Sequence, residues 1–179
     1  MTTILLVRHG ETDWNVHRRV QGHSDTPLND TGRAQSRALA ESLAGETFDA
    51  VYSSDLLRAH ETARIVAAAK GLAVTAIPDL REKHFGTWEG FTDEEIVARF
   101  PEASHGHWGD EETSEEMATR IREALVRIAE AHPGGRVLVV THGGPVRSLL
   151  ARCGVASGPI GNCSVHELRF GDGRFAAVD

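Results

Sequence analysis

The sequence predicts an α/β fold, a three-layer α/β/α sandwich around a mostly parallel central sheet. Two unbroken apolar runs, Ile4–Val7 and Val137–Val140, are rich in Val, Ile and Leu, which is typical of strands buried on both faces of a parallel sheet. Predicted strands and helices alternate along the chain, as they do in doubly wound sheets. At 179 residues the chain is most simply one domain, residues 1–179, with a sizeable core.

The first half of the chain shows this alternation clearly. After the first strand comes a long polar loop, about residues 9–30, and a loop of that length in a compact domain is more often functional than idle. A helix is expected over residues 32–43, with Asp30 or Thr31 as its cap. The order continues with a strand over 48–53, a helix over 56–70 that Gly71 closes, and a strand over 72–77.

Residues 78–113 are irregular and aromatic, and we expect them to form a small insertion or lid. Two capping boxes, Thr92-x-x-Glu95 and Thr113-x-x-Glu116, predict a short helix inside the insertion and a long helix after it. The His142 strand follows, and then a helix with Pro145 in its first turn, where a missing N–H costs nothing. The chain ends in a predicted hairpin over 163–170 and 174–178.

The composition limits the partners. The net charge of −7 argues against non-specific binding to nucleic acid or membranes, because both use basic surfaces. An anionic substrate would therefore need a local basic pocket inside an acidic protein. The candidate arginines lie in the first third of the chain: Arg8, Arg18, Arg19, Arg33, Arg58 and Arg64.

Cysteine use and the N-terminal residues favour a cytoplasmic protein. Cys153 and Cys163 are the two cysteines, too few for a disulfide framework, and they predict reduced thiols. Met1 leads into the first strand without the pattern of a signal peptide, and no apolar stretch approaches the ~20 residues of a membrane span. The oligomeric state stays open, with a homodimer as one option.

Each of the two apolar runs ends in a His-Gly pair, at His9-Gly10 and His142-Gly143. Ligands of open α/β sheets bind at the carboxyl ends of the strands. If the two strands are neighbours, His9 and His142 face one another across a pocket. Histidine titrates nearer neutrality than other side chains, so two of them at one sheet edge indicate chemistry rather than two unrelated loop histidines.

Arginines beside these histidines indicate phosphate as the ligand. The guanidinium of Arg8 is always charged and offers a planar fork of donors suited to phosphate, and a neutral His9 imidazole attacks phosphorus without first losing a proton. Arg58 follows another predicted strand end and can reach the same pocket. Phosphoryl transfer depends mostly on positioning and charge neutralisation, which two arginines and a second histidine supply.

A leaving alkoxide also needs a proton, and Glu82 is the leading general acid. We expect its aromatic surroundings to desolvate the carboxyl and raise its pKa toward neutrality. Glu89 and Glu11 are competing candidates, and an exposed glutamate in surface ion pairs is the alternative for Glu82 itself.

These residues stand in motifs that resemble the histidine phosphatase superfamily, the phosphoglycerate mutase-like group. The ordered set runs through nearly the whole chain and is highly specific, although each piece alone is weak. The motifs are Leu6–Asn15 (LVRHGETDWN), Gln21-Gly22, Pro27-Leu28 before Gly32–Gln35, Ser53–Ala59, Arg81-Glu82, Phe85–Gly90 and Thr141–Gly144.

The resemblance implies a role for each matching residue. His9 would be the phosphorylated nucleophile, and Arg8, Arg58 and His142 would bind the phosphoryl group. Glu82 would protonate the leaving oxygen and then activate the water that hydrolyses phosphohistidine. At the pocket, Asn15 and the backbone N–H of Gly143 would add hydrogen bonds, and Thr12, Gln21 and Gly22 would shape the wall.

Within this group the sequence favours a phosphatase over a mutase. Mutases carry a longer insertion with basic and Asn residues that hold the substrate carboxylate, whereas residues 91–113 here are short and acidic, with Arg99 as the one basic residue. The stretch Phe85–Gly90 resembles broad-specificity and alpha-ribazole-type phosphatases. The resemblance therefore implies a phosphomonoesterase that acts on small phosphorylated metabolites without cofactor or metal. Phosphoglycerate mutase is the alternative.

Two other classes of function compete with this one. His105 and His107, beside Asp110, Glu111 and Glu112, have the residue types of a metal site, but their spacing is not closed, so a solvated loop is favoured. A phospho-ligand binding module without catalysis is disfavoured, because a binder needs neither nucleophile nor acid. Three tryptophans are candidate stacking platforms or packing residues: Trp14, Trp88 and Trp108.

Overall fold

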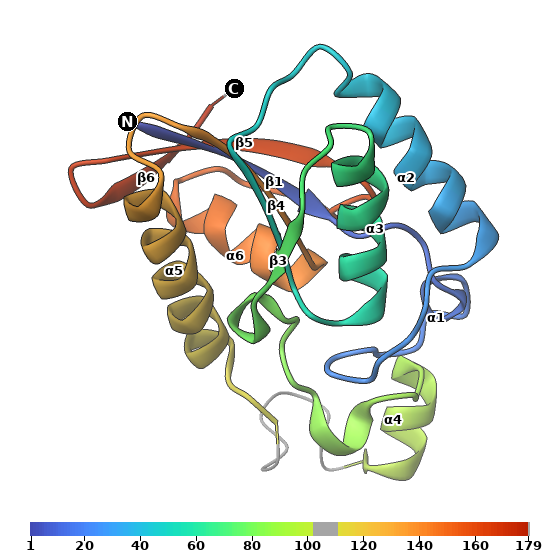
Figure 1. Cartoon of the computed structure of the whole chain (residues 1–179). Coiled ribbons are helices and arrows are strands. Elements are labelled where there is room, and N and C mark those ends of the chain that lie inside the picture. Colours follow the sequence, from blue (N-terminus) through green and yellow to red (C-terminus); the bar gives the residue numbers. More distant parts are fainter. Residues whose placement is uncertain (102–110, 179) are drawn as a thin grey trace.

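A central six-stranded sheet lies between two layers of helices in the computed structural model, which describes residues 1–101 and 111–178 (Figure 1). The strand order is β3-β2-β4-β1-β5-β6. The first four strands pair in parallel, and β5 pairs antiparallel with both β1 and β6, so the predicted mostly parallel sheet is confirmed. The strand bounds are β1 (Thr2–Arg8), β2 (Ala50–Ser53), β3 (Val74–Ala76), β4 (Arg136–Thr141), β5 (Val165–Gly171) and β6 (Arg174–Ala177).

Helices cover both faces of the sheet, as the apolar strands predict. Successive side chains of a strand point to opposite faces. Leu5 and Val7 of β1 pack in the core layer of α2 and α3, whereas Ile4 and Leu6 pack in the layer of α5 and α6. The helix bounds are α2 (Asp30–Ser42), α3 (Leu57–Ala68), α5 (Ser114–Ala131) and α6 (Gly143–Arg152).

The cap of α2 differs from the prediction. Asn29 is the N-cap, and its side-chain oxygen accepts a hydrogen bond from the Gly32 N–H at 2.8 Å. The helix therefore begins at Asp30, and neither Asp30 nor Thr31 caps it. All three residues are good caps, so local preference alone does not distinguish them.

The long loop over 9–30 contains a one-turn helix that the sequence reading missed, α1 (Asp13–Val16). A capping box begins it: the Thr12 hydroxyl accepts a bond from the Asn15 N–H, and the Asn15 side chain accepts one from the Thr12 N–H. This turn fixes the direction of the Asn15 side chain, which matters for the site below.

Strands β2 and β3 are shorter than predicted, beginning at Ala50 and Val74. Phe48 and Leu72 pack in the core beside α2 and α3. They are apolar because they are buried there, although neither belongs to a strand of the sheet. Gly71 follows α3 in the left-handed conformation (φ +65°), as predicted. The helix itself ends earlier than predicted, at Ala68.

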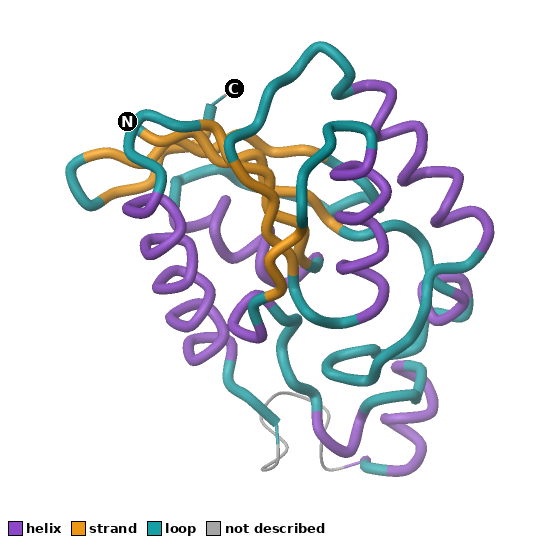
Figure 2. The backbone as a smooth tube through the Cα atoms, in the orientation of Figure 1, coloured by secondary structure: helices purple, strands orange, loops and turns teal. Residues whose placement is uncertain are grey.

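The insertion after β3 packs against the loop after β1. It contains two single turns of 3₁₀ helix, Pro78–Leu80 and Gly86–Trp88, and the helix α4 (Asp93–Arg99). Both predicted capping boxes are confirmed. Val20 exchanges backbone hydrogen bonds with Phe91 and Gly90, and Figure 2 shows the two segments side by side below the sheet. Together these segments form one end of the molecule, where the parallel strands end.

No helix in residues 1–101 or 111–178 qualifies as a membrane span. The longest described helix is α5, with 18 residues, and charged residues recur along it.

Candidate active site

Strand register brings the two predicted histidines together. Arg8 of β1 pairs with Thr141 of β4, so the next residues, His9 and His142, leave neighbouring strands at the same level. Their ring centroids lie 5.1 Å apart at an interplanar angle of 61°. The two histidines therefore face one another, as their positions at the strand ends predict.

The His9 ring is held in one tautomer by the backbone. Its Nδ1 atom lies 2.7 Å from the carbonyl oxygen of Gly10, and because a carbonyl only accepts, Nδ1 carries the proton. The lone pair is then on Nε2. Burial lowers the pKa of His9 well below its ordinary value of 6.5, and the charges of Arg58 and Arg8 lower it further. At neutral pH this imidazole is therefore uncharged, with its lone pair on Nε2.

His142 is fully buried at the N-cap of α6. Neither of its ring nitrogens has a hydrogen-bond partner within the part of the chain that the structure describes. Burial lowers its pKa well below 6.5, and the positive charges of Arg58 and Arg8 act in the same direction. Buried polar atoms without partners are rare, and here they are available to a ligand.

Arg8 and Arg58 make hydrogen bonds through the terminal Nη atoms of their guanidinium groups. Arg58 donates to the carbonyls of Gly22 and Ser24, both at 2.8 Å, and Arg8 donates to the carbonyl of Ile160. The Nε–H of each arginine is buried and has no partner among the described residues. Burial lowers the pKa of Arg58 to about 10. Both side chains are thus held rigidly with a free donor beside the histidines.

Glu82 reaches the same place from the insertion. Its Oε2 atom accepts a hydrogen bond from the Gly144 N–H at 3.0 Å, in the first turn of α6, and its Oε1 atom accepts one from its own neighbour Lys83 at 2.8 Å. Its negative charge acts on both Arg8 and Arg58. A carboxyl group therefore lies beside the two arginines.

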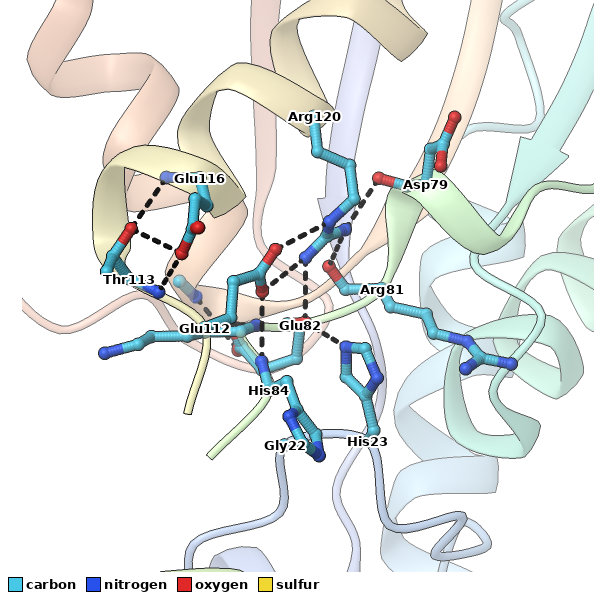
Figure 3. A network of polar contacts seen from close by, with 12 residues as sticks. Gly22, His23, Asp79, Arg81, Glu82, His84, Glu112, Thr113, Glu116 and Arg120 are labelled. Carbon is cyan, nitrogen blue, oxygen red and sulfur yellow. Dashed lines mark hydrogen bonds and ion pairs between the residues drawn. The ribbon is translucent and has the colours of Figure 1, made fainter. Parts of the chain in front are cut away.

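Arg120 of α5 holds the backbone that carries Glu82 (Figure 3). Its guanidinium donates to three backbone carbonyls of this segment, those of Asp79 (2.8 Å), Arg81 (3.0 Å) and Glu82 (3.2 Å). The His23 ring donates to the Glu82 carbonyl from the opposite side, at 2.9 Å. The position of the carboxyl group thus depends on a helix in the core.

Glu112 completes this network. Its carboxylate accepts two hydrogen bonds from Arg120, at 2.9 and 2.8 Å, and one from the His84 N–H at 3.1 Å (Figure 3). Burial alone would raise the pKa of Glu112, but these bonds outweigh it and lower the pKa. Arg120 thus binds the backbone at Glu82, and its ion-pair partner Glu112 binds the backbone at His84. Together the two side chains hold the chain on both sides of Lys83.

The two competing carboxylates are used elsewhere. Glu89 accepts hydrogen bonds from His23, Ser24 and Phe85, at 2.7–3.0 Å, and joins the insertion to the loop after β1. Glu11 accepts a bond from Asn29 beside α2. Neither lines the cavity described next, whereas Glu82 does.

A cavity of about 650 Å³ opens over these groups. Two of the predicted site residues, His142 and Thr12, do not line it. His142 lies buried beside His9. The other predicted residues are in its described lining: Arg8, His9, Asn15, Gln21, Gly22, Arg58, Glu82 and Gly143. Thr12 lies behind the wall, where its hydroxyl contacts the side-chain oxygens of Asn15 and Gln21. Gly22 adopts φ +51°, and a Cβ there would lie 2.1 Å from Glu89.

The sequence reading missed several residues of this cavity, notably Lys83 and Arg147. Arg147 lies on α6, five residues after His142, a spacing that does not place the two on one helix face, so the sequence pattern carries no signal for it. Conversely, four of the six candidate arginines do not line the cavity: Arg18, Arg19, Arg33 and Arg64. The local basic pocket in an acidic protein is therefore present, but its four described basic residues come from four separate parts of the chain: Arg8, Arg58, Lys83 and Arg147.

Of the residues proposed for the alternative metal site, the structure describes Glu111 and Glu112. His105, His107 and Asp110 lie outside the described residues, as does Trp108. Within the described part, Glu111 pairs with Lys83 at 3.6 Å and Glu112 with Arg120 at 2.8 Å, and no group of potential ligands is assembled there.

Trp14 is placed for packing, because its ring lies against Gly90, where a Cβ would be 3.2 Å away. Neither Trp14 nor Trp88 is among the described residues that line the cavity.

Comparisons with known proteins agree with this geometry. The family model described as histidine phosphatase superfamily (branch 1) matches residues 4–179. Two Arabidopsis thaliana proteins are similar over most of both chains. Phosphoglycerate mutase-like protein 4 is 42% identical over 95% of this chain and 80% of its own length, and metal-independent phosphoserine phosphatase is 40% identical over 96% and 78%. A mycobacterial glucosyl-3-phosphoglycerate phosphatase, solved as a complex with VO3, superposes with a TM-score of 0.86 at 31% identity and covers 98% of this chain and 96% of that one.

Proposed function

The chain belongs to branch 1 of the histidine phosphatase superfamily, and we propose that it is a phosphomonoesterase that hydrolyses small phosphorylated metabolites through a phosphohistidine on His9. One observation carries the proposal: four buried nitrogens without partners surround the single-tautomer ring of His9. They are Arg8 Nε, Arg58 Nε and both ring nitrogens of His142. A phosphoryl group supplies acceptors for the Nε–H groups of Arg8 and Arg58 and for the one N–H of the neutral His142 ring.

The bound phosphoryl group would be held mainly by charge. Arg8 and Arg58 neutralise its oxygens, and His142 takes up a proton and becomes a third cationic donor. The N–H of Gly143 at the start of α6 and the amide of Asn15 add neutral hydrogen bonds. The solved relative with bound VO3 supports this assignment, since vanadate resembles a phosphoryl group in shape and charge.

In the first step the lone pair of His9 Nε2 attacks phosphorus. The P–N bond forms, the bond from phosphorus to the ester oxygen breaks, and its electron pair leaves with that oxygen. Glu82 takes up a proton from water when the phosphate dianion binds, gives that proton to the leaving oxygen and returns to a carboxylate. The hydrogen bond from His9 Nδ1 to the Gly10 carbonyl stabilises the cationic ring of phosphohistidine.

In the second step water attacks the phosphorus of phosphohistidine. The Glu82 carboxylate accepts a proton from that water, the P–O bond forms, and the P–N bond breaks with its electron pair returning to Nε2. Orthophosphate leaves, and Glu82 returns the proton to water. Atoms and charges therefore balance over the cycle, and Glu82 serves first as acid and then as base.

A mutase is the second candidate, because a relative is named phosphoglycerate mutase-like. Arg99, the one basic residue of the short insertion, argues against it. Its guanidinium stacks on the Phe91 ring, 4.6 Å from the centroid, and does not line the cavity. Within the described part of 91–113, no basic residue therefore lines the cavity to hold a substrate carboxylate as in a mutase.

The test is phosphate release from an aryl phosphate and from a panel of sugar, glycerate and amino-acid phosphates, by wild type and His9→Ala, with and without EDTA. We expect release that survives EDTA and is almost abolished in His9→Ala. Chelator-sensitive activity would contradict the metal-free mechanism. Interconversion of 2- and 3-phosphoglycerate without phosphate release would identify a mutase instead.

A further inference from the structure

Among the cations of the described cavity lining, Arg147 is the one that is outside the proposed phosphoryl site and is also without a partner in the described residues. Of the charged residues in the described lining, Glu82 is the sole carboxylate, and four residues are basic. Arg8 and Arg58 are anchored on backbone carbonyls beside His9, and Lys83 is paired with the buried carboxylate of Glu111. The Arg147 guanidinium has neither a hydrogen bond nor an ion pair within residues 1–101 and 111–178.

The position of Arg147 relates it to the phosphoryl site. It lies on α6, five residues after His142, which is roughly 7.5 Å along the axis at 1.5 Å per residue. It remains close enough to Arg8 for its charge to lower the pKa of that guanidinium. The positive charges of Arg8 and Arg147 on one wall repel each other, so a ligand with two anionic groups suits this wall better than a simple phosphate.

The wall beside Arg147 fits a short organic group. The hydroxyl-bearing Ser114 and Ser148 line this part of the cavity, and Met117 and Ala151 contribute apolar surface. The net charge of the chain is −7, so an anionic ligand gains attraction from this cavity that most of the protein surface does not offer.

We propose that Arg147 binds a carboxylate of the substrate, so that the preferred substrates are phosphomonoesters with a carboxylate a few bonds from the phosphate. This inference rests on the proposed function. A carboxylate is favoured over a second phosphate because one unpaired guanidinium balances a single negative charge, and its planar fork matches the two carboxylate oxygens. The relatives whose names include phosphoserine and glucosyl-3-phosphoglycerate act on molecules of this class.

The test compares two substrates that differ only in this group. Phosphoserine and phosphoethanolamine share the phosphate, the two-carbon chain and the ammonium group, and only phosphoserine has the carboxylate. Their kcat/KM values are measured with wild type, Arg147→Met and Arg147→Lys. Arg64→Met is the matched control, because Arg64 is exposed on α3, makes no ion pair in the described residues and lies outside the cavity.

We expect wild type to prefer phosphoserine. Arg147→Met should lower kcat/KM for phosphoserine about 10- to 100-fold, mainly through KM, and change that for phosphoethanolamine less than about threefold. Arg147→Lys should restore part of the preference, and Arg64→Met should behave as wild type.

Equal losses on both substrates, or no preference in wild type, would overturn the inference while His9-dependent hydrolysis still stood. A preference for bisphosphorylated substrates that Arg147→Met removes would replace the carboxylate by a second phosphate. If neither substrate nor any other phosphomonoester were hydrolysed, the proposed function itself would fail.

Discussion

The Oε2 atom of Glu82 lies 3.0 Å from the backbone nitrogen of Gly144, in the first turn of the helix that His142 caps. This contact joins the proposed acid to the element that also carries the proposed phosphate-binding groups. It further explains the glycine, because a Cβ at position 144 would lie 2.2 Å from Oε1 of Glu82. Only movement of the flexible carboxyl end would relieve that overlap.

Gly144→Ala should therefore reduce catalysis without unfolding the protein. Displacement of Glu82 removes general acid–base help, which is typically worth about 10²–10⁴-fold, so kcat for an alkyl phosphate should fall at least about 100-fold. Alanine favours helix by up to about 1 kcal/mol, so thermal stability should be unchanged or raised. Adding Glu82→Gln should cost little more, whereas a multiplicative further loss would show that Gly144 acts independently of Glu82.

Arg120→Met should resemble a mild loss of Glu82. The substitution frees three backbone carbonyls and the partly buried Glu112 carboxylate, so we expect a stability loss of about 1–3 kcal/mol. Activity should fall more for alkyl phosphates, which need a proton on the leaving oxygen, than for an activated aryl phosphate. Arg127→Met is the control, because Arg127 on the same helix pairs only with the exposed Asp79 carboxylate at 2.5 Å.

Equal losses on both classes of substrate would reduce Arg120 to a purely structural role. If Arg120→Lys recovered part of the lost activity, and recovered more of it on alkyl phosphates than on the aryl phosphate, the result would support a role of Arg120 in positioning Glu82.

Binding of a phosphoryl analogue should take up a proton at neutral pH. His142 is neutral in the free protein because burial and Arg58 lower its pKa, and a dianion beside the ring raises that pKa again. Calorimetry of tungstate binding in two buffers of different ionisation enthalpy measures the uptake. We expect binding to tighten as pH falls, and His142→Gln to lose this dependence. Binding without proton uptake in wild type would contradict the assigned role of His142.

Stability should decrease as pH falls below 6.5. The pKa values of His9 and His142 are lowered in the folded state, so below 6.5 the unfolded chain binds protons that the folded chain does not. Each histidine then contributes a slope of about 1.4 kcal/mol per pH unit. The free energy of unfolding is measured by urea unfolding at several pH values below 6.5. Its slope against pH should be smaller in His142→Asn than in wild type by about 1.4 kcal/mol per pH unit. An unchanged slope would mean that His142 is protonated in the folded protein.

Much of the fold and of the reactive centre follows from local sequence. The runs before His9 and His142 are buried on both faces, so their place in the sheet and their shared end are predictable. The capping boxes at Thr92 and Thr113 involve residues three apart, and both form. The Asn29 cap was not predictable in the same way, because Asp30 and Thr31 offer equivalent side chains.

Tertiary contacts decide what the sequence leaves open. Glu82, Glu89 and Glu11 are alike in sequence, and only their partners separate a carboxylate in the cavity from two that join loops. Arg120 and Arg147 lie on helices that look like ordinary charged surfaces, and they become informative when the segments they face are known. Residues that are far apart in sequence supply these partners, so helical or strand periodicity carries no trace of them.

The most direct test of the account is whether His9 carries the phosphoryl group during turnover. Wild type and His9→Ala are mixed with a saturating phosphomonoester, denatured rapidly under alkaline conditions that preserve phosphohistidine, and mapped by peptide mass spectrometry. We predict one phosphoryl group on the peptide containing His9 in wild type and none in His9→Ala, whose turnover should be close to abolished. Steady turnover by His9→Ala, or a wild type that releases phosphate with its phosphoryl group on another residue, would contradict the mechanism.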